Sequence, residues 1–171
     1  TTFTMLPASP SRSRRSLPTG DTDPYRPTPE QPLRCRARQI DSDNQFEPHH
    51  HAWGQLAYCA SGLMQVTVLQ APETTTIVPP SRAVWIPPGV RHAVTIVEAA
   101  QLLTLYIDAS AVPAHWTQSR VMVVSPLLRE LVHALDRPQP PALDAGRALL
   151  TLLFHEMEHA DTQPLGVPMP S

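Results

Sequence analysis

The sequence predicts a mainly β domain, an antiparallel sandwich or barrel, followed by two α-helices. Short β-like runs separated by turn residues extend from residue 33 to residue 124, and such regular spacing is typical of sandwiches and barrels. After Val124 the apolar residues recur every three or four positions, which is the period of an amphipathic helix. The chain has 171 residues, enough for one hydrophobic core, so we expect a single domain with flanking segments.

Residues 1–32 are expected to be a disordered, proline-rich leader. They hold few large apolar residues and show no periodicity, so they cannot bury enough surface to offset chain entropy. The alternative is a basic arm that docks on the domain or on DNA, although residues 12–15 are too short to do so alone. Beyond residue 40 the chain is net acidic. Because phosphate contacts need Lys and Arg on one face, that portion is not expected to bind nucleic acid.

The predicted strands cover residues 33–40, 53–60, 63–70, 74–78, 82–86, 91–97, 101–108 and 120–124. Ser61-Gly62 is predicted to form a tight hairpin turn between the second and third strands. Cys35 and Cys59 lie in strand-like sequence without metal-type spacing, which indicates reduced, buried thiols of a cytoplasmic protein. No apolar run is long enough to span a bilayer, so no membrane partner is expected.

Two helices are predicted within residues 125–160. Ser125-Pro126 fits an N-cap followed by proline at the first helical position. The second helix, from about Ala142 to Ala160, presents a leucine-rich arc wider than a small barrel needs to cover. We therefore expect a homodimer whose interface includes Leu149, Leu152 and Leu153. Residues 161–171 are expected to be a linker to a domain that this chain lacks.

A polar site is predicted around residues 49–55. If this stretch is one β-strand, His49, His51, Trp53 and Gln55 share one face. Neutral imidazoles bind divalent transition metals, and three ligands with solvent make an open site. His92 would complete the site if a barrel folds its strand over the first. The alternative is a polar pocket of hydrogen-bonded histidines without metal, in which Gln55 orients an organic ligand.

A second histidine pattern lies in the second predicted helix. His155-Glu156-x-x-His159 matches the spacing of zinc peptidases. At 100° per residue, both histidines fall well away from the centre of the apolar arc, and no third ligand follows at a usable spacing. We therefore do not interpret the pattern as a peptidase site.

The first histidine cluster resembles the cupin family. His49-x-His51, Gln55 and Gly62 match the spacing of the first cupin motif, with Gln55 in place of the usual Glu. The segment from Pro87 to His92 matches the core of the second motif, without the family's later Asn. More narrowly, two runs are similar to the N-terminal cupin sensor domain of AraC/XylS-type transcriptional regulators. These are Pro48-His49-x-His51-x-Trp53-Gly54-Gln55-Leu56 and Arg82-Ala83-Val84-Trp85-Ile86-Pro87-Pro88-Gly89-x-x-His92.

The resemblance implies a single cupin barrel (a double-stranded β-helix, jelly-roll-like) at residues 33–124, with dimerisation helices at residues 125–160. The expected function is the effector-sensing and dimerising domain of a bacterial transcription regulator in the cytoplasm, not an enzyme. A helix-turn-helix domain of a longer parent protein would bind DNA, because no recognition-helix pattern follows residue 160.

The implied pocket binds a small-molecule effector or a divalent metal, and Zn, Ni, Fe and Mn are not distinguished. The metal ligands would be His49, His51, Gln55 and His92, and Trp53 and Trp85 would line the pocket. The alternative is a free-standing cupin metalloenzyme of the dioxygenase or isomerase type, which would use the same four ligands.

Overall fold

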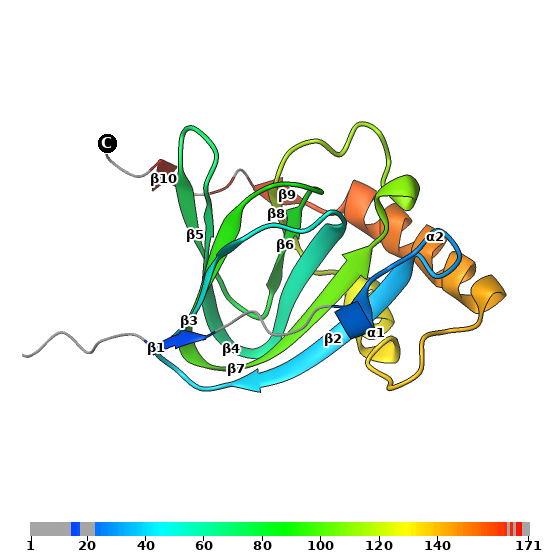
Figure 1. The fold of residues 1–171 in the computed structure, drawn as a ribbon, viewed down its shortest axis with the longest axis horizontal. Helices are drawn as coiled ribbons and strands as arrows, with labels where there is room; N and C mark the ends of the chain where they lie inside the picture. Colours follow the sequence, from blue (N-terminus) through cyan, green and yellow to red (C-terminus); the bar gives the residue numbers. More distant parts are fainter. Residues whose placement is uncertain (1–14, 18–22, 164, 166, 169–171) are drawn as a thin grey trace, which may run out of the picture.

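The computed structural model of the chain describes residues 15–17, 23–163, 165 and 167–168. The strands are β1 (Arg15–Leu17), β2 (Leu33–Ile40), β3 (Asn44–His49), β4 (Gly54–Val68), β5 (Thr74–Val78), β6 (Arg82–Ile86), β7 (His92–Ile107), β8 (Arg120–Val123), β9 (Thr162–Gln163) and β10 (Val167–Pro168). The helices are α1 (Pro126–Ala134) and α2 (Leu143–His159), with short 3-10 turns η1 (Asp23–Tyr25) and η2 (Ala109–Ala111). The predicted class, mainly β with two C-terminal helices, is confirmed (Figure 1).

The long strands β4 and β7 organise the sheet, because they pair with each other along their length and each takes part in two layers. In the first layer the order is β2-β7-β4-β6-β8-β9, and in the second it is β1-β3-β7-β4-β5-β10. The two layers face each other as in a jelly roll. Among the described residues the hydrogen-bonded path does not return to its start, so the predicted barrel is an open one.

The predicted hairpin at Ser61-Gly62 is wrong. Both residues lie inside β4, where the register against β7 shifts and the strand passes from the first layer to the second. Gly62 has a φ of 85°, and a Cβ there would lie 2.3 Å from the carbonyl oxygen of Ala99. Glycine is therefore required for a bulge that bends the strand. The predicted strands at 91–97 and 101–108 are likewise joined, in β7.

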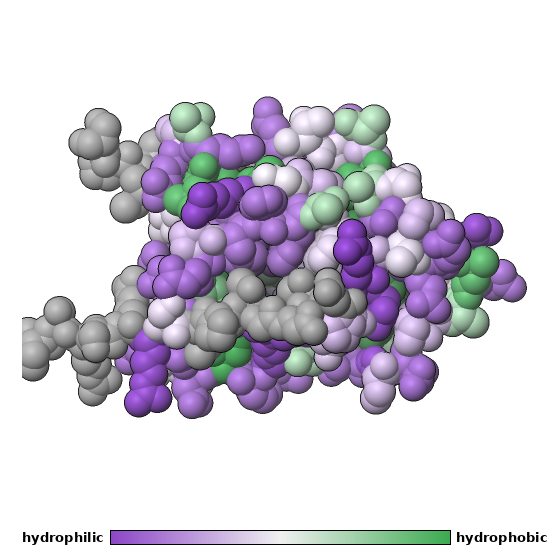
Figure 2. Space-filling model, viewed as in Figure 1, coloured by the Kyte–Doolittle hydropathy of each residue, from purple (hydrophilic) through white to green (hydrophobic). Residues whose placement is uncertain are grey.

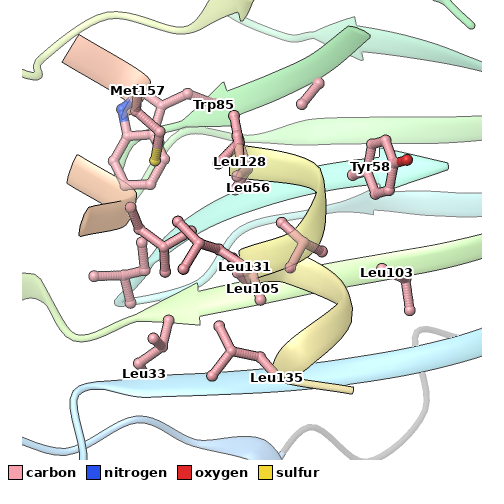
Figure 3. Close-up of a cluster of buried hydrophobic side chains, with 14 of the residues drawn as sticks. Leu33, Leu56, Tyr58, Trp85, Leu103, Leu105, Leu128, Leu131, Leu135 and Met157 are labelled. Atoms are coloured by element: carbon pink, nitrogen blue, oxygen red, sulfur yellow. The ribbon is translucent and has the colours of Figure 1, made fainter. Parts of the chain in front are cut away.

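Alternation along the strands creates two hydrophobic clusters, because successive side chains point to opposite faces. Ala57 and Cys59 of β4 belong to the cluster between the two layers, whereas Leu56 and Tyr58 belong to the cluster under the helices. In Figure 3, α1 lies across the first layer, and its Leu128 and Leu131 point toward the strands. The labelled side chains of this helix-covered cluster are Leu33, Leu56, Tyr58, Trp85, Leu103, Leu105, Leu128, Leu131, Leu135 and Met157.

The start of α1 follows the predicted capping. The Ser125 hydroxyl oxygen accepts a hydrogen bond from the backbone N–H of Leu128 at 3.0 Å, and Pro126 occupies the first helical turn. This satisfies a backbone donor that has no partner within the helix. None of the described helices combines the length and the apolarity that crossing a membrane requires.

Parts of the predicted leader and linker pair with the sheet. β1 lies parallel to β3, while β9 and β10 are antiparallel to β8 and β5. These segments differ from the expected disordered leader and free linker, because backbone hydrogen bonds tie them to strands of both layers. Residues 1–14, 18–22, 164, 166 and 169–171 lie outside the described part of the chain.

Candidate metal and effector site

Three of the predicted ligands converge where β3 meets β7. His49 ends β3 and pairs in register with His92, the first residue of β7, while His51 lies in the turn between β3 and β4. One candidate ligand atom from each of the three lies within 4.8 Å of the other two. The ring centroids of His49 and His92 are 4.3 Å apart, and those of His49 and His51 are 4.9 Å apart.

The path of the chain to this cluster differs from the prediction. Residues 50–53 are not part of a strand, so His51 and Trp53 are positioned by a turn and not by strand alternation. The backbone N–H of Gly89 donates a hydrogen bond to the carbonyl oxygen of His51 at 2.8 Å. This bond holds the turn that carries His51 against the Pro-Gly turn that precedes His92. The two sequence motifs are therefore joined physically.

Backbone carbonyls orient two of the three rings. Nδ1 of His49 donates to the carbonyl oxygen of Glu47 at 2.7 Å, and Nδ1 of His92 donates to that of Val90 at 2.9 Å. Because a carbonyl only accepts, each Nδ1 carries the proton and each Nε2 keeps a free lone pair. His92 is 1% exposed, and its Nε2 finds no hydrogen-bond partner among the described residues.

Burial keeps these imidazoles neutral. It lowers the pKa of His92 to about 3 and that of His51 to about 4, and it also lowers the pKa of His49. The neighbouring histidines lower these pKa values further, because each protonated ring would repel the others. At neutral pH all three rings are in the form that binds a transition metal.

Gln55, the fourth predicted ligand, lies beside the cluster near the start of β4. It is 6% exposed, and its Oε1 finds no hydrogen-bond partner within the described part of the chain. Gln55 lines a cavity between the two layers together with Arg38, Phe46, His49, His51, Ala57, Val94, Leu102, Thr104 and Tyr106. A divalent transition metal fits this donor set of three neutral imidazoles and an unpaired amide oxygen.

The cavity is small, with a volume of about 30 Å³. This is room for a metal ion with one or two waters, since a single water needs at least about 10–15 Å³. Pockets that enclose a drug-sized ligand measure about 300–1,000 Å³. In this conformation the site therefore suits an ion and a small group bound to it.

The two tryptophans that were predicted to line the pocket lie in different places. Trp53 stacks on His51, with ring centroids 5.0 Å apart and an interplanar angle of 8°. Trp85 instead points away from the cavity into the helix-covered cluster, where its ring centroid lies 5.4 Å from that of Trp116. A Cβ at position 54 would lie 2.3 Å from the Trp85 ring, which explains the glycine there.

Comparison with known proteins identifies the chain. Residues 31–165 match the sequence model of the AraC-like ligand binding domain. The chain belongs to this family. The AraC-like domain is 36% identical over 129 residues to the HTH-type transcriptional regulator NimR of Escherichia coli (strain K12), a match that covers 72% of this chain and 44% of that protein. The chain thus spans less than half of the length of this relative. The predicted family is confirmed.

Solved structures resemble the AraC-like domain over about half of its length. Oxalate decarboxylase from Bacillus subtilis is 22% identical with a TM-score of 0.43, covering 47% of this chain and 22% of that one. The conserved SPY1581 protein of unknown function from Streptococcus pyogenes is 26% identical with a TM-score of 0.42, covering 46% of this chain and 66% of that one.

A row of arginines on β2 was missed by sequence reasoning. Arg34, Arg36 and Arg38 lie opposite Tyr106, Thr104 and Leu102 of β7, three residues that line the cavity. Residues paired across an antiparallel ladder share a face of the sheet. The signal that could have found this row is the alternate spacing of arginine in the predicted strand 33–40.

The three leucines of the AraC-like domain that were predicted to form a dimer interface differ in burial. Leu153 is fully buried in the helix-covered cluster, and Leu149 is half-buried against it. Leu152 is 44% exposed, so it is the member of the predicted interface trio that lies on the surface. The face of the molecule in Figure 2 is mainly hydrophilic, with its hydrophobic side chains in small, separate patches.

The peptidase-like histidines of α2 do not form a metal site with other described residues. His155 and His159 are both exposed, and Nδ1 of His159 donates to the carbonyl oxygen of His155 at 2.8 Å. Glu156 accepts a hydrogen bond from the hydroxyl of Ser125, the N-cap residue of α1, at 2.9 Å, so it ties α2 to the start of α1. Within the described residues, the group of three candidate ligands is His49, His51 and His92.

Proposed function

We propose that this AraC-like domain is the effector-sensing and dimerising part of a bacterial transcription regulator, and that His49, His51 and His92 hold a divalent transition metal. The supporting observation is the convergence of three neutral imidazoles within 4.8 Å. A buried polar atom without a partner costs about 1–3 kcal/mol. Coordination of a metal by Nε2 of His92 would remove that cost, and Oε1 of Gln55 is available as a further neutral ligand.

A bound metal would supply a positive centre with an open coordination position for an effector. The residues of the chain would do the rest. His49 and His92 would tie the end of β3 to the start of β7, and His51 would hold the β3–β4 turn. Gln55 precedes Leu56, which packs under the helices, so a shift of β4 at the site would change the packing of α1 and α2. Binding would thereby favour one of two arrangements of the helices.

The helices are the proposed dimerisation surface. Leu127, Leu143 and Leu152 are exposed on α1 and α2, and large apolar side chains at an interface are removed from water. DNA binding would belong to a helix-turn-helix domain of a longer parent protein, and the regulator would act in the cytoplasm. Sedimentation of the wild type and of Leu152→Glu tests this surface. A wild-type monomer at tens of micromolar would contradict it.

A metalloenzyme is the weaker candidate. The described residues that line the cavity include no Asp or Glu, so none of them supplies a carboxylate that could act as a general base. The curated relative is a transcriptional regulator. Both observations favour the sensor over the enzyme.

Metal content measured after dialysis against Zn²⁺, Ni²⁺, Mn²⁺ or Fe²⁺ tests the site. We expect stoichiometric metal in the wild type and a loss of at least about tenfold in affinity for His51→Ala, since each ligand contributes more than 1.4 kcal/mol. His50→Ala is the matched control, because His50 is exposed and lies between two proposed ligands. Both variants carry His155→Ala and His159→Ala, which removes the surface pair. Equal metal in both would overturn the proposal.

A further inference from the structure

The cavity beside the histidines offers no negative charge to a bound metal. The described residues that line it include Arg38 and no Asp or Glu. Imidazole and amide ligands are neutral, so a divalent ion would keep its full charge next to a guanidinium group. Buried charge in a medium of low dielectric constant needs a compensating charge. An anionic occupant would balance the charge of the metal and would suit the half-buried guanidinium group of Arg38.

The arginine row of β2 extends the positive charge along the same wall. Arg34 donates through Nη2 to the carbonyl oxygen of Pro24 at 2.9 Å. The guanidinium carbon of Arg36 lies 5.2 Å from the Tyr25 ring centroid. These two groups therefore contact the N-terminal segment. Arg38, at the far end of the row from Arg34, is the member that lines the cavity.

The lining of the cavity combines polar and apolar side chains. Its polar members include His49, His51 and Gln55, which are the proposed metal ligands. Its apolar members are Phe46, Ala57, Val94 and Leu102. The guanidinium carbon of Arg38 lies 5.0 Å from the Phe46 ring centroid, so the cation lies beside an apolar ring. An occupant that matches this lining has an anionic end and a short apolar end.

We propose that the effector of this domain is a short-chain carboxylate, an inference that rests on the proposed metal site. Its carboxylate faces the metal and Arg38, whose planar fork matches the geometry of a carboxylate. Its tail lies against Phe46 and Leu102. The cavity of about 30 Å³ has room for little beside the metal in this conformation, so only the shortest tails, of about one or two carbons, are expected to bind.

Titration of the Co²⁺-loaded protein with propionate tests the inference, because the visible absorption of Co²⁺ reports a change in its ligands. We expect a saturable spectral change with propionate and none with propionamide, which has the same shape without the charge. Inorganic phosphate, an anion without an apolar tail, should bind more weakly than propionate. Calorimetry on the same samples gives the affinity independently of the spectrum.

Two charge-removing variants of β2 sharpen the test. Arg38→Gln should weaken propionate binding by about tenfold, since a charge-assisted hydrogen bond contributes about 1.5–3 kcal/mol. Arg34→Gln removes the same charge from the same face of the strand, but Arg34 is bound to Pro24. It should change the affinity for propionate by less than about twofold, as expected of a screened charge outside the cavity.

The possible failures are distinguishable because Co²⁺ content is measured first. If Co²⁺ does not bind, the proposed metal site fails and the carboxylate inference fails with it. If Co²⁺ binds but propionate has no effect, the metal site stands and the inference is overturned. Equal responses to propionate and propionamide, tighter binding of phosphate, or an unaltered Arg38→Gln would also overturn it.

Discussion

Neighbouring residues of β4 belong to two regions that are packed in opposite ways. Leu56 points into the helix-covered cluster, where Trp85, Leu105 and Leu153 are fully buried. Gln55 points into the cavity, which keeps an open volume of about 30 Å³. The partnerless buried polar atoms near the cavity are Gln55 Oε1, Trp53 Nε1 and His92 Nε2, whereas the helix-covered cluster holds Trp85 Nε1, counting the described residues only.

This difference assigns stability mainly to the helix-covered cluster and ligand binding to the cavity, although one sheet forms both. Close packing of apolar side chains stabilises the helix-covered side. The cavity side keeps donors and acceptors free, at a cost to stability, and such groups are what a ligand binds. Four experiments test this division, from the largest expected effect to the smallest.

Removing a large side chain from the helix-covered cluster should have the largest effect. Leu153→Ala should lower the free energy of unfolding by about 2–5 kcal/mol, because it leaves a cavity in a closely packed cluster. Metal affinity of the folded protein should stay the same, since Leu153 lies outside the cavity. Urea denaturation and metal titration measure the two quantities. A decrease in the free energy of unfolding of less than about 1 kcal/mol, or a changed metal affinity, would contradict the division between the two regions.

The bend at which β4 passes between the layers comes next. Gly62→Ala should destabilise the protein by about 2–4 kcal/mol, because the left-handed conformation and the contact with the Ala99 carbonyl both oppose a Cβ. Gly89→Ala is the matched control, with a φ of 80° and nothing within 4 Å of the added Cβ. Its cost should be only about 1–2 kcal/mol. Equal losses in denaturation experiments would show that the close approach at Gly62 is unimportant.

Acidification should lower the free energy of unfolding of the metal-free protein through the histidines beside the cavity. Burial holds the pKa of His92 at about 3, whereas an unfolded histidine titrates near 6.5. Between these values the unfolded chain binds more protons. The free energy of unfolding of the metal-free protein is therefore undiminished above pH 6.5 and falls as the pH decreases toward 3.

For His92 the slope is up to about 1.4 kcal/mol per pH unit. Half-buried His51, with a pKa of about 4, adds a smaller contribution of the same sign. Denaturation with EDTA at several pH values measures the slope, and His92→Ala should flatten it. An unchanged slope in that variant would assign the acid sensitivity to other groups.

The smallest effect is expected outside both regions. His155→Ala should change the free energy of unfolding by less than about 0.5 kcal/mol and leave the metal content unaltered, because His155 is exposed on α2. Denaturation and metal analysis of this single variant are sufficient. Loss of metal would move the metal centre from the sheet to the helix.

Sequence patterns predicted the elements that depend on local periodicity and capping. Ser125-Pro126 marked the start of α1, and the helix observed at Leu143–His159 lies inside the predicted range. The spacing of His49, His51 and His92 led to the family. The arginines of β2 could have been found in the same way, since alternate positions in a strand share a face.

Other features required the folded chain. A positive φ at Gly62 suits a hairpin or a bulge equally, and only the pairing of β4 with β7 distinguishes them. Trp53 and Trp85 both stand in cupin-like motifs, yet the first stacks on His51 and the second lies under the helices. Similarly, a leucine-rich arc does not reveal whether Leu153 is covered by its own sheet or by a second copy.

The sequence alone determined where most of the sheet and both helices lie and which histidines are candidates for one site, although β3 was not among the predicted strands. Periodicity and capping are local, so they can be recognised without knowing what the chain packs against. The tertiary structure decided that His51 reaches the site from a turn, that Trp85 lies outside the site and that Arg38 lines it. Those outcomes depend on contacts between residues far apart along the chain, and such contacts exist only when the two layers have closed around the cavity.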